Sequence, residues 1–351
     1  MTRLWKIKCL LGFIIVTVGV FFLYSCVAGR GTMEHKFDLN EIQADMTSLA
    51  DSTPAEYPES IRYYFDYFGL SPEDGIEGAE HLFGTFKSQG FDIAAHIYKP
   101  AVSKGTVVLM HGYLNHCGQL NHIIQYLLSQ GYAVCAYDMP GHGLSTGLRG
   151  GIDDFEKYSD VLDDFKEVLK AKTEGPYHII AFSHGACPVI QQLLDNQEDF
   201  FDKVVLCAPL VRPVQWKKAQ ATYRLYWFFK KDVKRIVRRN TSDKQFLEFN
   251  SKKDFLHIQR VPLLWVRSLE KWNAKIEQLS TSEKEILIVQ GDKDSTVDWR
   301  YNTKFLEKKF KNTKCVMIKG AKHELFNEKE ELKNKVFNEI NNYLGLSKDL
   351  K

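Results

Sequence analysis

The feature that most constrains the fold is an alternation, beginning near Gly105, of short apolar runs with segments of helical periodicity. Strands buried on both faces of a parallel sheet form such continuous apolar runs, and helices connect them. The runs lie at residues 106–110, 132–137, 178–182, 204–208, 286–290 and 314–318. The helical segments lie at residues 119–130, 155–172, 186–197, 299–311 and 329–344. The sequence therefore predicts an α/β fold with a mostly parallel central sheet flanked by helices.

One long segment interrupts this alternation. About 75 residues separate the fourth apolar run from the fifth, which is too long for a loop inside a compact domain. We expect residues 210–284 to form a helical cap. The core into which the cap is inserted then comprises residues 58–209 and 285–351.

The N-terminal segment is typical of an export signal, because basic residues precede an apolar run from Cys9 to Ala28. Its end, Leu23-Tyr24-Ser25-Cys26, resembles the bacterial lipoprotein signal, so Cys26 is the expected lipid anchor. An uncleaved transmembrane helix is the alternative, since the run has about the length that spans a bilayer. Both interpretations make residues 1–28 a membrane anchor and place the rest of the chain outside the cytoplasm.

Residues 29–57 are polar and contain Pro54, which indicates a flexible spacer between the anchor and the core. A short amphipathic helix is expected next, because apolar residues follow at helical spacing as far as Gly69. Two strand-like segments, residues 80–87 and 91–98, are joined by Gln89-Gly90 and predict a hairpin at the leading edge of the sheet.

Charge and cysteine content narrow the function classes. The formal net charge is +3, but residues 210–280 contain 17 Lys and Arg against 6 Asp and Glu. No zinc-ligand spacing, RNA-binding strand motif or basic zipper accompanies this basic segment, so we expect no nucleic-acid partner. Five cysteines lie beyond the anchor without a closely spaced framework, and we expect them to be small buried hydrophobes. The sequence implies no metal and no organic cofactor.

The third apolar run ends in a turn suited to a catalytic serine, Ala181-Phe182-Ser183-His184-Gly185. In a nucleophile elbow the serine has a positive φ between a strand and a helix, so the residues two places before and after it must be small. Ala181 stands where such motifs usually have glycine and still meets the steric requirement. A strand-to-helix turn without chemistry is the alternative, which the rest of the chain has to exclude.

A serine hydroxyl needs a base to take its proton, and the base needs an acid to orient it. In folds with this elbow, the acid and the histidine follow the serine in that order, on loops after later strands. The loop after residues 286–290 offers Asp292, Asp294 and Asp298, and the loop after residues 314–318 offers His323. We assign Asp294 as the acid and His323 as the base, and the other two aspartates as turn or capping residues.

Two backbone N–H groups are needed to stabilise the oxyanion of the tetrahedral intermediate. We expect one from His184, directly after the serine, and one from Tyr113, because Gly112 lets that loop approach closely. The side chain of His184 is expected to pack or to contact substrate, and that of His111 to orient its loop.

Together these motifs resemble the α/β-hydrolases of the serine aminopeptidase S33 type, and within it the monoacylglycerol lipase and lysophospholipase L2 branch. The resemblance runs from about residue 82 to residue 346. It rests on His111-Gly112-Tyr113, the segments 137–145 and 147–163, Ser183, Asp294, and Gly320 through Leu325. It implies an α/β-hydrolase fold and an enzyme that cleaves an ester or a peptide through an acyl-serine intermediate, without a cofactor.

The cap carries the clues to substrate. An aromatic block containing Trp216, Tyr226 and Trp227, the expected substrate-binding residues, precedes a basic block at residues 230–239. Such a pattern suits an anionic membrane surface or a lipid headgroup, and the alternative is a subdomain core with a solvated charged face. The sequence thus predicts a membrane-tethered serine hydrolase of lysophospholipids or monoacylglycerols. A peptidase or general carboxylesterase, and a lipid-binding protein that has lost catalysis, are the alternatives.

Overall fold

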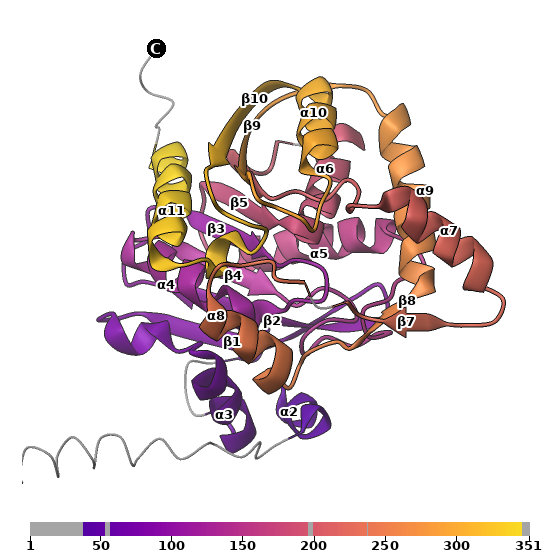
Figure 1. Cartoon of the computed structure of the whole chain (residues 1–351). Coiled ribbons are helices and arrows are strands. Elements are labelled where there is room, and N and C mark those ends of the chain that lie inside the picture. Colours follow the sequence, from indigo (N-terminus) through magenta and orange to yellow (C-terminus); the bar gives the residue numbers. More distant parts are fainter. Residues whose placement is uncertain (1–37, 53–56, 196–198, 237, 346–351) are drawn as a thin grey trace, which may run out of the picture. The chain divides into compact units, whose positions relative to one another are not determined.

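The computed structural model describes residues 38–52, 57–195, 199–236 and 238–345 (Figure 1). The chain divides into two units, Met1–Asp38 and Leu39–Lys351. The predicted export signal, with the lipid anchor at Cys26 or the alternative transmembrane helix, lies outside the described residues. Within the ranges that are described, no helix is both long and apolar enough to cross a membrane.

An eight-stranded sheet forms the centre of the second unit, in the order β1-β2-β4-β3-β5-β6-β9-β10. The strands are β1 (Glu80–Ser88), β2 (Phe91–Lys99), β3 (Thr106–Met110), β4 (Ala133–Tyr137), β5 (Tyr177–Phe182), β6 (Lys203–Cys207), β9 (Ser282–Gly291) and β10 (Phe310–Ile318). From β4 to β10 neighbouring strands run parallel, whereas β1 and β2 pair antiparallel and join the sheet antiparallel to β4. The predicted α/β fold with a mostly parallel sheet is confirmed.

The edge hairpin has the two-residue turn that its sequence predicts. Gln89 and Gly90 have φ angles of 51° and 79°, and Ser88 pairs with Phe91 across the turn. Two positive φ angles match the twist of the flanking strands, so the turn fixes the register of β1 against β2.

Six helices of the core connect or cover the strands. They are α3 (Glu59–Phe68), α4 (Asn121–Ser129), α5 (Glu156–Lys172), α6 (Ala186–Asp195), α10 (Trp299–Lys309) and α11 (Glu330–Gly345). Figure 1 shows α4 and α11 on one face of the sheet and α5 and α6 on the other. Every residue of β3 and β6 is buried as a result, which explains their uninterrupted apolar composition. The last strand begins at Phe310, earlier than its apolar run, because an edge strand carries exposed polar residues.

The segment before the core is a correction to the expected spacer. Residues 39–45 form helix α2 (Leu39–Asp45), whose Ile42 is buried, and Leu49 is buried against the hairpin. The N–H of Leu49 donates to the carbonyl oxygen of Thr85 at 2.7 Å. The prediction of a flexible spacer over residues 29–57 is therefore wrong for residues 39–52, because two well-placed apolar side chains suffice to dock a polar segment.

The insertion between β6 and β9 contains more than helices. It consists of α7 (Trp216–Tyr226), β7 (Asp232–Lys234), α8 (Lys244–Glu248), a π-helical turn (Phe249–Lys253), β8 (Arg260–Pro262) and α9 (Leu263–Gln278). The strands β7 and β8 pair antiparallel, which the expectation of a helical cap did not include. Helix α9 packs against the core, since Leu269 and Ile276 are fully buried and Ser268 donates to the carbonyl oxygen of Ile152 at 2.9 Å.

Candidate active site

Ser183 lies in the sharp turn between β5 and α6. Its φ is 53°, in the left-handed region that side chains other than glycine rarely adopt. A Cβ on Gly185 would lie only 2.7 Å from the carbonyl oxygen of His111, and Ala181 is fully buried beside β3. The small residues are thus required by close packing against β3, and the turn has the geometry of a nucleophile elbow.

The structure brings Ser183, His323 and Asp294 into one hydrogen-bonded chain. The Oγ of Ser183 lies 3.0 Å from Nε2 of His323, and Nδ1 of His323 donates to Oδ2 of Asp294 at 2.7 Å. These loops follow β5, β9 and β10, whose carboxyl ends meet at the same edge of the parallel sheet. The arrangement matches the relative positions of nucleophile, base and acid in serine hydrolases.

Asp294 is held in its charged form. Besides His323, it accepts hydrogen bonds from the N–H groups of Thr296 (2.7 Å) and Val297 (3.2 Å) and from Nε2 of Gln290 (3.1 Å). Burial alone would raise the pKa of Asp294, but the charge of His323 and these hydrogen bonds bring it below its ordinary value. A carboxylate ionised in this way can stabilise an imidazolium during the reaction.

The two neighbouring aspartates have the structural contacts that the sequence predicted. Asp292 accepts a hydrogen bond from the N–H of Gly320 at 2.7 Å, and Asp298 caps α10 and forms an ion pair with Arg212 at 3.1 Å. Neither carboxylate contacts the imidazole of His323. The structure therefore places Asp294, of the three candidates, in the position of the acid.

His323 is buried, and cap and core together fix its position. Burial lowers the pKa of His323, but the charge and hydrogen bond of Asp294 raise it above the ordinary value. The backbone N–H groups of His323 and Glu324 both donate to the carbonyl oxygen of Asn240, at 3.0 and 2.9 Å. A residue of the insertion thus holds the histidine loop in place.

The two predicted oxyanion donors flank Ser183. A Cβ on Gly112 would lie 3.3 Å from Cβ of Ser183, so the loop that carries Tyr113 passes close to the serine only because residue 112 is glycine. The amide of His184 lies in the first helical turn after the elbow, where N–H groups lack an intrahelical acceptor. Both backbone segments therefore border the place where a substrate carbonyl would meet Ser183.

The imidazoles near the serine have packing roles. His111 donates from Nδ1 to the carbonyl oxygen of Gly112 (2.8 Å) and accepts at Nε2 from the N–H of Met139 (2.9 Å), so it orients its loop as expected. His184 is buried among aromatic rings, including Tyr113 and Tyr158, and burial lowers its pKa to about 3. A base with so low a pKa would stay unprotonated and does not compete with His323.

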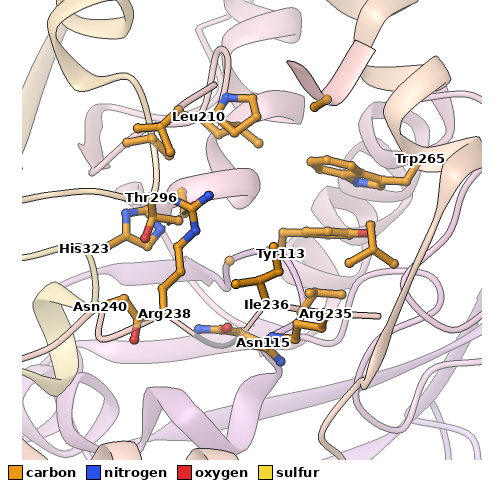
Figure 2. Close-up of a pocket in the computed structure, with 18 of the residues that line it drawn as sticks. Tyr113, Asn115, Leu210, Arg235, Ile236, Arg238, Asn240, Trp265, Thr296 and His323 are labelled. Carbon is orange, nitrogen blue, oxygen red and sulfur yellow. Dashed lines mark hydrogen bonds between the residues drawn. The ribbon is translucent and has the colours of Figure 1, made fainter. Parts of the chain in front are cut away.

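A cavity of about 400 Å³ opens onto Ser183 and His323 (Figure 2). Its apolar walls include Leu210, Val214, Leu263, Trp265 and Val266. Trp265 stacks on the ring of Tyr113 with centroids 3.8 Å apart, and the Tyr113 hydroxyl donates to the carbonyl oxygen of Gly150 at 2.6 Å. Polar and basic residues line the rest of the cavity, among them Asn115, Arg235, Arg238, Asn240 and Glu324. The site is therefore amphipathic.

The three predicted substrate-binding residues do not line this cavity. Trp216 is half-buried against the core, and Tyr226 and Trp227 are 38% and 41% exposed. Helix α7 instead turns Lys218, Ala219 and Thr222 towards the cavity. The prediction took an aromatic block as a pocket wall, but the angular position of each residue around α7 decides which side chains face inward.

Four other residues line the cavity: Arg235 and Arg238, which the sequence placed in a basic block suited to a membrane surface or a headgroup, and Asn240 and Trp265, which it did not single out. The two arginines were part of the basic block, but a run of Lys and Arg does not show which of its members face inward. Trp265 lies in a short apolar run whose partner, Tyr113, is distant in the sequence.

In the described ranges, no group of three or more His, Cys, Asp or Glu side chains could hold a metal ion. The five cysteines of the body are free, and all but the partly exposed Cys315 are buried, as expected.

Comparison with known proteins gives a consistent result. Residues 101–330 match the family model described as serine aminopeptidase, S33. The chain is 25% identical over 307 residues to monoglyceride lipase of Rattus norvegicus, covering 84% of this chain and 95% of the relative. It is 23% identical over 286 residues to a probable lysophospholipase L2 of Haemophilus influenzae, covering 72% and 87%.

The fold is shared with a solved structure, a soluble variant of monoglyceride lipase from Saccharomyces cerevisiae in complex with a substrate analog. The TM-score is 0.65 at 19% sequence identity, over 75% of this chain and 94% of that chain. The resemblance drawn from the motifs is confirmed. The chain belongs to the serine aminopeptidase S33 family and is a lipase-like and lysophospholipase-like α/β-hydrolase.

Proposed function

We propose that this protein is a serine esterase that cleaves the carboxylic ester of single-chain lipids through an acyl intermediate on Ser183. The observation that carries the proposal is the hydrogen-bonded chain of Ser183, His323 and Asp294 at an amphipathic cavity. In the first step, Oγ of Ser183 attacks the ester carbonyl while Nε2 of His323 takes its proton. His323 then donates this proton to the leaving alcohol oxygen. In the second half of the reaction, His323 takes a proton from water, which attacks the acyl carbonyl, and returns a proton to Oγ of Ser183 as the fatty acid is released.

In this mechanism the remaining residues stabilise charge. Asp294 keeps the proton on Nδ1 of His323 and stabilises the imidazolium. The amides of Tyr113 and His184 donate to the oxyanion, and each such donor contributes about 10²-fold or more in comparable enzymes. The complete chain of hydrogen bonds argues against the alternative in which catalysis has been lost.

The lining of the cavity favours a lipid ester. A single acyl chain needs an apolar wall beside the serine, and Leu210, Leu263 and Val266 lie in that wall. The relatives named monoglyceride lipase and lysophospholipase L2 are named for esters of this kind.

A peptidase is the second candidate, because the matching family model is described as an aminopeptidase. Binding the free ammonium of a peptide calls for an available carboxylate. Among the described residues that line the cavity, Glu324 is the one carboxylate, and Asn115 and Asn240 already donate to it, at 3.3 and 3.0 Å. Because this carboxylate already has hydrogen-bond partners and the cavity contains several cations, an ester substrate is favoured over a peptide.

Membrane attachment belongs to the same proposal. Cys26 would carry the lipid anchor outside the cytoplasm. The end of α7 and the following loop expose Leu225, Trp227, Phe228 and Phe229, with fractions of 65%, 41%, 81% and 84%. Lys230 and Lys231 follow directly. Exposed aromatic residues beside lysines suit insertion into the interface of an anionic membrane.

A fluorophosphonate probe tests the chemistry. We expect the wild-type protein to be labelled and the Ser183→Ala variant to remain unlabelled. Absence of labelling in a folded wild-type protein would contradict the proposed nucleophile. Turnover of lysophosphatidylcholine and monoacylglycerol, compared with that of an aminoacyl amide, then separates the esterase from the peptidase.

A further inference from the structure

The charges that line the cavity are strongly unbalanced. Four cations face it, Lys218, Lys234, Arg235 and Arg238, against the single carboxylate of Glu324 in the described lining. Burial also raises the pKa of Glu324, which favours the protonated, neutral form of this carboxyl group. The cavity next to the serine therefore has a positive potential.

Arg235 is a largely buried cation whose charged form is disfavoured by burial and favoured by the charges of Glu324 and Asp254. Its Nη1 lies 3.3 Å from Nδ1 of His257 and 3.4 Å from the carbonyl oxygen of Ile258, both long contacts to neutral groups. No carboxylate of the described chain lies within ion-pair distance of its guanidinium, and burial lowers the pKa of Arg235. Removing a charge from water without a counter-charge at ion-pair distance is costly, so an anion that paired directly with Arg235 would stabilise it.

Arg238 lies closer to the reacting groups. Its Nη1 donates to the carbonyl oxygen of Ser295, the residue after Asp294. Its charge lowers the pKa of His323, and Figure 2 shows its side chain extending towards His323 and Thr296. Arg238 too has no carboxylate at ion-pair distance among the residues that the structure describes.

Three arginines of the same insertion that lie outside the cavity have carboxylate partners. Arg212, Arg224 and Arg260 form ion pairs with Asp298, Glu270 and Asp232, at 3.1, 2.6 and 2.5 Å. The two arginines that face the cavity have no such partner among the described residues. A ligand anion would complete the pairing there.

We infer that Arg235 and Arg238 form a binding site for the phosphate of a single-chain phospholipid. This inference rests on the proposed function and specifies its substrate class, a lysophospholipid with an anionic headgroup rather than a neutral monoacylglycerol. Guanidinium groups bind phosphate oxygens with paired, charge-assisted hydrogen bonds. In Figure 2, Arg235 lies near Asn115, the Arg238 side chain extends from near Asn240 towards Thr296 and His323, and Leu210 and Trp265 lie on the opposite side of the opening.

Kinetics of the full-length protein in detergent test this site. Lysophosphatidic acid and monoacylglycerol with the same acyl chain are the two substrates, and the ratio of their kcat/KM values is the readout. We expect a wild-type ratio of at least about 10, which the double variant Arg235→Gln/Arg238→Gln lowers at least about tenfold. The matched control Arg224→Gln should change the ratio by less than about twofold. A wild-type preference for monoacylglycerol, or a ratio that the double variant leaves unchanged, overturns the inference.

A binding measurement separates this inference from the proposed chemistry. An ether-linked lysophosphatidic acid cannot be hydrolysed, and its affinity is measured by calorimetry for the wild-type protein and both arginine variants. Binding that weakens at least about tenfold only in the double variant supports the phosphate site even if Ser183 fails to react with the probe. Labelled Ser183 with equal ether-lipid affinity in all three proteins overturns the site and leaves the esterase. Displacement by inorganic phosphate at equal concentration would assign the site to free phosphate and overturn the headgroup.

Discussion

The core around Ser183 and the inserted cap differ in how their polar groups are satisfied. In the core, Asp294 accepts four hydrogen bonds, and both ring nitrogens of His323 are hydrogen-bonded, one to Asp294 and one to Ser183. In the cap, Arg235 and Arg238 face the cavity with no carboxylate at ion-pair distance among the described residues. The contrast teaches that the polar groups around Ser183 are satisfied within the chain, whereas the two cap arginines are left available to an anionic ligand.

The two regions are nevertheless connected. The carbonyl oxygen of Asn240, in the cap, accepts the N–H groups of His323 and Glu324. Asp254, also in the cap, accepts from Nε2 of His116 at 2.9 Å and from Nε2 of Gln119 at 2.7 Å, both in the core. The position of the His323 loop therefore depends in part on hydrogen bonds from the cap.

The largest effect should come from the acid of the core. Asp294→Asn would offer an amide to His323 and favour the wrong tautomer, and we expect kcat for a soluble ester to fall by about 10⁴-fold. Asp292→Asn is the matched control, because its amide oxygen can still accept from the N–H of Gly320, and it should lose less than about tenfold. If the two variants exchanged these effects, the acid would be Asp292.

The next effect concerns the hydrogen bonds between cap and core. Asp254→Ala removes the carboxylate that accepts from His116, Gln119 and the N–H of Leu256, and of these only Gln119 has another acceptor, Oδ1 of Asn250 at 3.4 Å. The free energy of unfolding in urea should fall by about 2–4 kcal/mol. Asp232→Ala, which removes a partly exposed ion pair with Arg260, should cost less than about 1 kcal/mol. Equal losses would show that the cap does not depend on this buried acceptor.

A smaller effect is expected at the membrane. Phe228→Ser/Phe229→Ser removes the most exposed aromatic groups of the cap, and binding to vesicles of phosphatidylglycerol and phosphatidylcholine should weaken about tenfold or more. The control is Val102→Ser, an 85% exposed apolar residue outside the cap. Sedimentation with vesicles measures both. Equal binding of wild type and the double variant would leave these aromatic residues as a solvated surface.

The smallest effect is a shift in pH dependence. His323 must be neutral to act as the base, and because its pKa is raised, kcat/KM for a soluble ester should fall as pH decreases, with a midpoint above 6.5. Arg238 opposes protonation of His323, so Arg238→Gln should move this midpoint to higher pH. The control Arg224→Gln should leave it in place. A midpoint that moved to lower pH would show that Arg238 does not act on the base through its charge.

Local sequence was enough to predict the parallel sheet, the edge hairpin and the elbow. Apolar runs mark strands buried on both faces, Gln89-Gly90 suits a turn with two positive φ angles, and the small residues around Ser183 avoid collision with β3. Each of these features depends on residues close in sequence or on a repeated pattern. The acid and the histidine were instead assigned from the chain order common to folds with this elbow, in which parallel strands bring their carboxyl ends to one edge.

Only the tertiary structure decided what the cap presents to the serine. Trp216, Tyr226 and Trp227 turned away from the cavity while Arg235 and Arg238 faced it, and a polar segment before the core docked through Ile42 and Leu49. The physical reason is that composition sets the character of a segment, but the side of it that is buried depends on contacts with residues far away in the chain. For this protein, the sequence determined the chemistry of the core, and the packing of the cap determined the cavity in which that chemistry acts.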